Sequence, residues 1–184
     1  MIIGLTGRAG TGKTTAAAAI AKELDLKIID LDKIGHKLLN NSHIKAELLA
    51  KFSPKILNQD QTINRDILSS IVFSSQSLLN DLNQIIHPKI KKEVLNTIKK
   101  HQDHHILIVG ALIKEIGLTP LCRKIITIDA DEKKIRQYLG EKSIILNFQR
   151  SQKEYQKEAA IVIQNNFDET FIQSCLETTA MLIE

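Results

Sequence analysis

Eight residues near the N-terminus combine glycine, lysine and threonine at spacings that suit phosphate chemistry. Residues 7–14 read GRAGTGKT and match the pattern G-x-x-x-x-G-K-[ST]. Glycines let backbone N–H groups turn inward around a phosphate, and the start of a following helix adds partial positive charge. A simple turn between a strand and a helix would not require Lys13 and Thr14 at these offsets. The residues expected to bind a nucleoside triphosphate are Gly7, Gly10, Thr11, Gly12, Lys13, Thr14 and Thr15.

Three of these side chains have distinct expected roles. The Lys13 ammonium would bridge the β- and γ-phosphates, and the Thr14 hydroxyl would be a ligand of Mg²⁺. Thr15 would reach the α-phosphate. The motif therefore predicts a site for a magnesium–nucleotide complex such as ATP, in which Lys13 acts on the phosphates that react.

Two aspartates end the next apolar run, which reads IIDLD over residues 28–32. In a doubly wound sheet the carboxyl ends of the strands line the ligand crevice, so Asp30 and Asp32 would face the phosphate loop. Asp32 could accept the proton of an attacking hydroxyl. Alternatively, Asp32 N-caps the helix predicted over residues 33–39, and both roles are compatible. For Asp30, helix capping or surface charge is the simpler interpretation.

The elements that must position these groups follow an alternating pattern. Short runs rich in isoleucine and valine predict strands, and longer stretches of helical period lie between them. This pattern is typical of an α/β fold, here a five-stranded parallel sheet flanked by helices. The phosphate motif lies between the first run and Ala16–Leu24, a segment of strong helix formers. The predicted strands are Ile2–Thr6, Lys27–Asp30, Ile106–Val109, Lys124–Ile128 and Ala160–Ile163.

The length of 184 residues indicates one domain over residues 1–184. Its predicted strands are unevenly spaced. Residues 33–105 separate the second and third strands, although a parallel crossover needs only about a dozen residues. We therefore expect a mostly helical insertion there. A smaller excess, rich in lysine, arginine and glutamine, lies between Glu132 and Glu158.

Composition excludes several classes of protein. Aromatic residues are 4% of the chain, tryptophan is absent, and 25 basic residues stand against 21 acidic ones, for a net charge of +4. Neither base stacking along a nucleic acid nor a concentrated basic face is indicated. Cys122 and Cys175 show no spacing typical of a metal site or a disulfide framework. We found no apolar stretch of about 18 residues and no targeting segment, so we expect a cytoplasmic protein without membrane or nucleic-acid partners.

Several further segments, in their order and spacing, resemble those of the dephospho-coenzyme A kinase family. The phosphate motif alone indicates only a nucleotide-binding protein. The Asn64-Arg65 and His87-Pro88 pairs are what make the chain similar to this family in particular. The matching segments are residues 3–15, 29–39, 63–68, 71–73, 82–90, 126–130 and 162–165.

The resemblance implies a P-loop kinase of the nucleoside-monophosphate-kinase type. Such an enzyme transfers the γ-phosphoryl of ATP, with Mg²⁺, to the 3′-hydroxyl of dephospho-coenzyme A. It implies that Asp32 is the catalytic base, that residues 33–105 bind the acceptor and that residues 133–157 form a lid over ATP. The residues it assigns to the acceptor are Asp30, Arg65 and His87, and those it assigns to the lid are Arg136, Lys142 and Arg150.

Some positions depart from the family pattern. The family has paired arginines in the lid, whereas Tyr138 and Lys142 stand near the matching positions, and lysine lacks the bidentate fork of arginine. Ser53 follows Phe52 where the family has glycine. The alternatives are therefore another kinase of small metabolites or nucleotides, or a nucleotide-binding module with weak or lost catalysis.

From the residues alone, two of the three acceptor candidates, Arg65 and His87, have simpler interpretations. Arg65 would be a surface residue at the start of a helix. His87 would be a histidine at a helix junction, with Pro88 in the first turn of the next helix.

Overall fold

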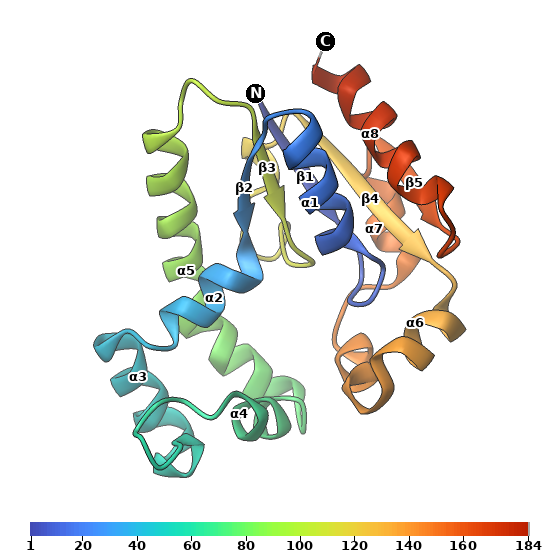
Figure 1. The fold of residues 1–184 in the computed structure, drawn as a ribbon. Helices are drawn as coiled ribbons and strands as arrows, with labels where there is room; N and C mark the ends of the chain where they lie inside the picture. Colours follow the sequence, from blue (N-terminus) through green and yellow to red (C-terminus); the bar gives the residue numbers. More distant parts are fainter. Residues whose placement is uncertain (184) are drawn as a thin grey trace.

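The computed structural model describes residues 1–183 and contains one parallel sheet with helices on both faces (Figure 1). The strand order is β2-β3-β1-β4-β5, and every neighbouring pair is parallel. All five carboxyl ends therefore meet at the same edge, and β1 is central. The first three predicted strands are confirmed, whereas the last two end two residues later than predicted. The strands are β1 (Ile2–Thr6), β2 (Lys27–Asp30), β3 (Ile106–Val109), β4 (Lys124–Ala130) and β5 (Ile161–Asn165).

Helices cover the sheet and extend beyond its carboxyl edge. In Figure 1, α3 and α4 lie beyond that edge on one side and α6 lies beyond it on the other. The α-helices are α1 (Lys13–Glu23), α2 (Leu31–Leu38), α3 (Ser42–Phe52), α4 (Arg65–Val72), α5 (Gln76–Lys100), α6 (Glu132–Leu139), α7 (Gln152–Glu158) and α8 (Thr170–Ile183). The 3₁₀ segments are η1 (Pro54–Ile56), η2 (Thr119–Leu121) and η3 (Gly140–Asn147).

The two faces of the sheet bury separate apolar cores, as the alternation of side chains along β3 shows. Ile106 and Ile108 pack with α2, α3, α4 and α5, whereas Leu107 and Val109 pack with α1 and α8. Because side chains alternate across a strand, a run of four apolar residues supplies both cores. This explains why β3 is continuous in isoleucine, leucine and valine.

Residues 33–105 are mostly helical, as expected. The only irregular pairing recorded there, within the described chain, is a single antiparallel bridge between Leu57 and Ile63. Asn64 caps α4, because its Oδ1 accepts the N–H of Ile67 at 2.9 Å, and Arg65 opens the helix as predicted. Ser53 has φ 67°, a region that favours glycine, at the position where the family has one.

The expectation that a helix begins at Pro88 is wrong. Pro88 lies inside α5, which runs from Gln76 to Lys100 without interruption. Proline removes one helical hydrogen bond, but Ile86, Ile90 and Val94 are buried in one core on both sides of it. Tertiary packing therefore keeps the two halves in one helix.

None of the helices in residues 1–183 is long and apolar enough to span a membrane.

Candidate active site

The phosphate loop (residues 7–14) leaves the carboxyl end of β1 and leads directly into α1. Gly7 and Gly12 have φ of 136° and 95°, and both are closely enclosed. A Cβ on Gly7 would lie 2.1 Å from the Ile128 carbonyl oxygen, and one on Gly12 would lie 2.5 Å from Asn165 Nδ2. Both the conformation and the space therefore require glycine. Helix α1 begins at Lys13, three residues earlier than predicted, so the motif supplies its first turn.

Buried hydrogen bonds hold this loop in shape. Asn165, at the end of β5, donates from Nδ2 to the Thr11 carbonyl at 2.9 Å. The Thr11 hydroxyl donates to the Arg8 carbonyl at 3.0 Å. Thr11 and Gly7 are buried and do not line the hollow described next, whereas the other predicted nucleotide-binding residues do.

One hollow of about 530 Å³ brings the phosphate loop and Asp32 together, a volume in the range of small-molecule sites. Of the predicted residues, Gly10, Gly12, Lys13, Thr14, Thr15 and Asp32 line it. The other lining residues are Ala9, Tyr138, Asn165, Phe167, Asp168, Phe171 and Ile172. Composition and motifs alone did not indicate the aromatic members of this second group, because they come from elements remote in sequence.

Lys13 is a buried cation without a carboxylate in direct contact among the described residues. Its Nζ donates to the Arg8 carbonyl at 2.7 Å, and its side chain is enclosed. Burial lowers the pKa of Lys13 to about 8, although the charges of Asp32 and Asp30 oppose this change. A polyphosphate bound in the loop would supply the negative charge that this ammonium lacks.

Asp30 and Asp32 have different roles in the structure. Asp30 is the N-cap of α2, because its Oδ1 accepts the Lys33 N–H at 3.0 Å, so the expectation that Asp32 could be the cap is wrong. Helix α2 starts at Leu31, and Asp32 faces the hollow from its first turn.

The Asp32 carboxyl is open to solvent at the hollow but surrounded by protein. Desolvation raises its pKa, the nearby Asp30 adds to this, and Lys13 and His36 oppose it. A carboxylate with a raised pKa is a better proton acceptor, which is the property required of a general base.

None of the three acceptor candidates, Asp30, Arg65 and His87, lines this hollow. Arg65 lines a second hollow of about 520 Å³ with His36, Lys37 and other polar groups of the insertion. His87, on α5, has a buried Nε2 without a hydrogen-bond partner among the described residues. Burial lowers the pKa of His87, while Glu115 opposes this.

The three predicted lid residues do not line the hollow either. Arg136 forms an ion pair with Glu132 at 2.7 Å. Arg150 binds Glu115 and Glu158, both at 2.7 Å, and its guanidinium lies 4.2 Å from the centre of the Tyr155 ring. Lys142 is exposed on η3. Within residues 133–157, the predicted lid, Tyr138 lines the hollow.

Arg8, which was not predicted as a site residue, joins the phosphate loop to the segment from Glu132 to Gln149. Its buried guanidinium donates from Nη2 to the Leu146 carbonyl at 2.7 Å and contacts Glu132 at 3.2 Å. The next residue, Ala9, donates its N–H to Gln149 Oε1 at 2.9 Å. The sequence indicated this role only through the presence of an arginine inside a glycine-rich loop.

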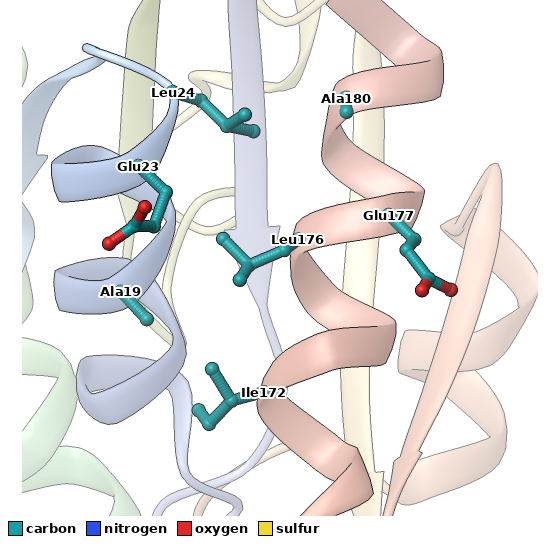
Figure 2. Close-up of a pocket in the computed structure, with 7 residues that line it drawn as sticks. All are labelled: Ala19, Glu23, Leu24, Ile172, Leu176, Glu177 and Ala180. Atoms are coloured by element: carbon teal, nitrogen blue, oxygen red, sulfur yellow. The ribbon is translucent and has the colours of Figure 1, made fainter.

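Another hollow lies between α1 and α8 (Figure 2). Figure 2 shows Leu24, Ile172 and Leu176 along this groove, with the carboxylates of Glu23 and Glu177 at its sides. Its lining residues include no basic side chain. It therefore lacks the chemistry needed to bind a phosphate.

A glycine-rich loop at the carboxyl end of the central strand, faced by a carboxylate across one hollow, is the arrangement of a P-loop kinase. A family model described as dephospho-CoA kinase matches residues 1–170. The chain belongs to the dephospho-CoA kinase family and is a kinase. The family resemblance and the five-stranded parallel sheet expected from the sequence are both confirmed.

Individual relatives agree with this family. The dephospho-CoA kinase of Dehalococcoides mccartyi is 33% identical over 190 residues, with 97% of this chain and 96% of the relative covered. That of Fusobacterium nucleatum is 35% identical over 176 residues, with 90% of each covered. The solved dephospho-CoA kinase from Campylobacter jejuni has a TM-score of 0.70 at 26% identity, with 98% of this chain and 96% of that chain covered.

Proposed function

We propose that this chain transfers the γ-phosphoryl group of ATP to the 3′-hydroxyl of dephospho-coenzyme A, which gives coenzyme A and ADP. The observation that carries the proposal is that Lys13 and Asp32 line one hollow above the phosphate loop. Lys13 can neutralise charge on the transferred phosphoryl group, and Asp32 can accept the proton of the attacking hydroxyl. Membership of the dephospho-CoA kinase family supplies the identity of the acceptor.

Phosphoryl transfer depends mainly on positioning and on stabilisation of charge. The N–H groups in the first turn of α1 have no helical acceptors, so they are available to the β-phosphate. Lys13 would leave the Arg8 carbonyl and bridge the β- and γ-phosphates. The Thr11 hydroxyl would still satisfy that carbonyl.

The residues present fit a nucleotide-bound Mg²⁺. The Thr14 side chain is exposed in the hollow, and Asp32 provides oxygen atoms in the same space. Residues 1–183 contain no group of three His, Cys, Asp or Glu side chains that could hold a metal by itself. This suits Mg²⁺, which keeps several waters and binds through phosphates with one or two protein ligands. The ion would neutralise phosphate charge, while Thr14 holds its position.

The acceptor and lid assignments extend the proposal beyond the hollow. Residues 33–105 would bind dephospho-coenzyme A, with Arg65 and His87 as contacts and Asp30 fixing the start of α2 beside it. Residues 133–157 would close over ATP. Arg136 and Arg150 are held by carboxylates in this structure, so either residue would exchange an ion pair for a phosphate contact on closure.

The test is release of ADP by the purified chain with Mg²⁺, ATP and a panel of acceptors. Release should depend on dephospho-coenzyme A and should be lost in Lys13→Ala and Asp32→Asn. Lys22→Ala, at an exposed position on the same helix, is the matched control and should retain full activity. ATP binding without transfer to any acceptor would refute the enzyme assignment and leave a nucleotide-binding module.

A further inference from the structure

Two aromatic side chains lie exposed at the rim of the phosphate-loop hollow. The chain has only five phenylalanines and two tyrosines. Even so, Tyr138 and Phe167 both line this hollow, and 76% and 45% of their surfaces are exposed. Exposed aromatic groups beside a phosphate site are unusual in a chain with so few of them. The low aromatic content of the whole chain, which argued against nucleic-acid binding, therefore does not exclude a local cluster of aromatic side chains at this hollow.

The rings come from two elements that are tied together. Tyr138 lies on α6, and Phe167 lies in the segment between β5 and α8. Lys134, also on α6, places Nζ 5.6 Å from the centre of the Phe167 ring and donates to the Asn166 carbonyl at 3.2 Å. These contacts hold the two sides of the rim in a common arrangement.

The backbone at Phe167 has an uncommon conformation that neighbouring groups hold in place. Its φ is 63°, in the left-handed region that bulky residues rarely adopt. Its N–H donates to Asn165 Oδ1 at 2.7 Å, and Asn165 also holds the phosphate loop through Thr11. One buried asparagine therefore fixes the loop and the aromatic residue relative to each other.

We propose that Tyr138 and Phe167 hold the nucleobase of the phosphoryl donor by stacking. This inference rests on the proposed function, because it requires a nucleotide whose phosphates occupy the loop. The hollow is lined both by Lys13 and Asp32, where the phosphates would react, and by the two rings, which matches a ligand with an anionic chain and an aromatic group. Each ring provides an apolar face that any base can cover.

Stacking would also decide which donors are accepted. The polar side chains near the rings are already engaged: Asn165 bonds Thr11 and Phe167, and Asp168 Oδ1 accepts the N–H and hydroxyl of Thr170 at 3.0 and 2.7 Å. Few side-chain groups are left to read the edges of a base. We therefore expect ATP and GTP to be used comparably and pyrimidine nucleotides less well, because purines stack over a larger area.

The experiment compares ADP with pyrophosphate as ligands of the full chain by calorimetry. Tyr138→Ala and Phe167→Gly should each weaken ADP binding by roughly 5- to 150-fold, the usual range for loss of one stacked ring, and leave pyrophosphate binding within about 2-fold. Glycine is chosen at position 167 because it accepts the observed φ. Ile144→Ala, an exposed apolar residue of the lid outside the hollow, is the control.

Tyrosine fluorescence gives an independent measurement. The chain has no tryptophan and two tyrosines, and Tyr155 is buried. ADP should quench the emission of Tyr138, whereas pyrophosphate should not. In Tyr138→Phe this quenching should disappear while ADP affinity is retained, because phenylalanine still stacks.

The outcomes separate this inference from the proposed function. If both ring variants bind ADP as well as the wild type does, the inference is refuted and the kinase assignment stands. An equal loss of ADP and pyrophosphate affinity would also refute it, because it would show damage to the phosphate loop. A wild-type chain that binds neither ligand would overturn the proposed function as well.

Discussion

Replacing Lys13 with methionine should stabilise the protein at neutral pH while it abolishes activity. Burial lowers the pKa of Lys13 from 10.5 to about 8. At 1.36 kcal/mol for each pKa unit, the folded state loses about 3 kcal/mol by holding this ammonium charged at pH 7. Methionine keeps the apolar stem and removes the charge. The variant also loses the hydrogen bond from Lys13 Nζ to the Arg8 carbonyl. Because the Thr11 hydroxyl still donates to that carbonyl, this loss lowers the expected gain in stability by only about 1 kcal/mol.

The net gain expected for Lys13→Met is therefore about 1–3 kcal/mol at pH 7. Its dependence on pH has a definite sign. Because the pKa of Lys13 is lower in the folded state than in the unfolded state, the unfolded chain binds more protons between pH 8 and pH 10.5. As the pH rises through this window, the wild-type protein should therefore become more stable, and the difference in free energy of unfolding between it and Lys13→Met should shrink.

The assay is urea unfolding, followed by circular dichroism, of the wild type, Lys13→Met and Lys22→Met at pH 7 and pH 10. Lys22 is 84% exposed on the same helix, so its variant should match the wild type. Because the other titratable groups are the same in all three proteins, their titration cancels when the free energies of unfolding are subtracted at each pH. A Lys13→Met variant that is less stable than the wild type at pH 7, or a difference that is equal at both pH values, would refute the reasoning. The expected exchange of activity for stability is typical of strained functional sites.

Three further predictions concern the base, the lid and the long helix. A plot of kcat/KM against pH should have an acid limb above pH 3.8 from Asp32 and an alkaline limb near pH 8 from Lys13. Asp32→Asn should lower kcat by roughly 10²- to 10⁴-fold and remove the acid limb, and persistence of that limb would argue against Asp32 as the base. Arg8→Ala should destabilise the fold by about 1–3 kcal/mol and speed proteolysis within residues 140–150, whereas unchanged digestion would show that Arg8 does not hold the lid. Pro88→Ala should stabilise the protein by about 1–2 kcal/mol in thermal melts, because it restores a hydrogen bond inside α5, and a lower melting temperature would contradict this.

The helix boundaries show how far the sequence could be interpreted. The helix at residues 33–39 was predicted with Asp32 as its alternative N-cap, and this was wrong, because Asp30 and Asp32 are both good N-cap residues and only the path of the chain from β2 selects Asp30. Pro88 suggested a helix start, because proline is common there. The buried positions on both sides of it, which require contacts with the sheet, produce one continuous helix instead.

The sequence by itself determined the sheet and the phosphate loop, because both depend on local patterns. Isoleucine and valine runs form buried strands, and the glycines, Lys13 and Thr14 act within a few residues of one another. Only the tertiary structure decided that Asp32 and not Asp30 lines the hollow with Lys13, that Arg8 binds Glu132 and the Leu146 carbonyl, and that Tyr138 and Phe167 line the same hollow. These groups are far apart in the chain, and their positions depend on how α2, α6 and β5 pack at the carboxyl edge of the sheet.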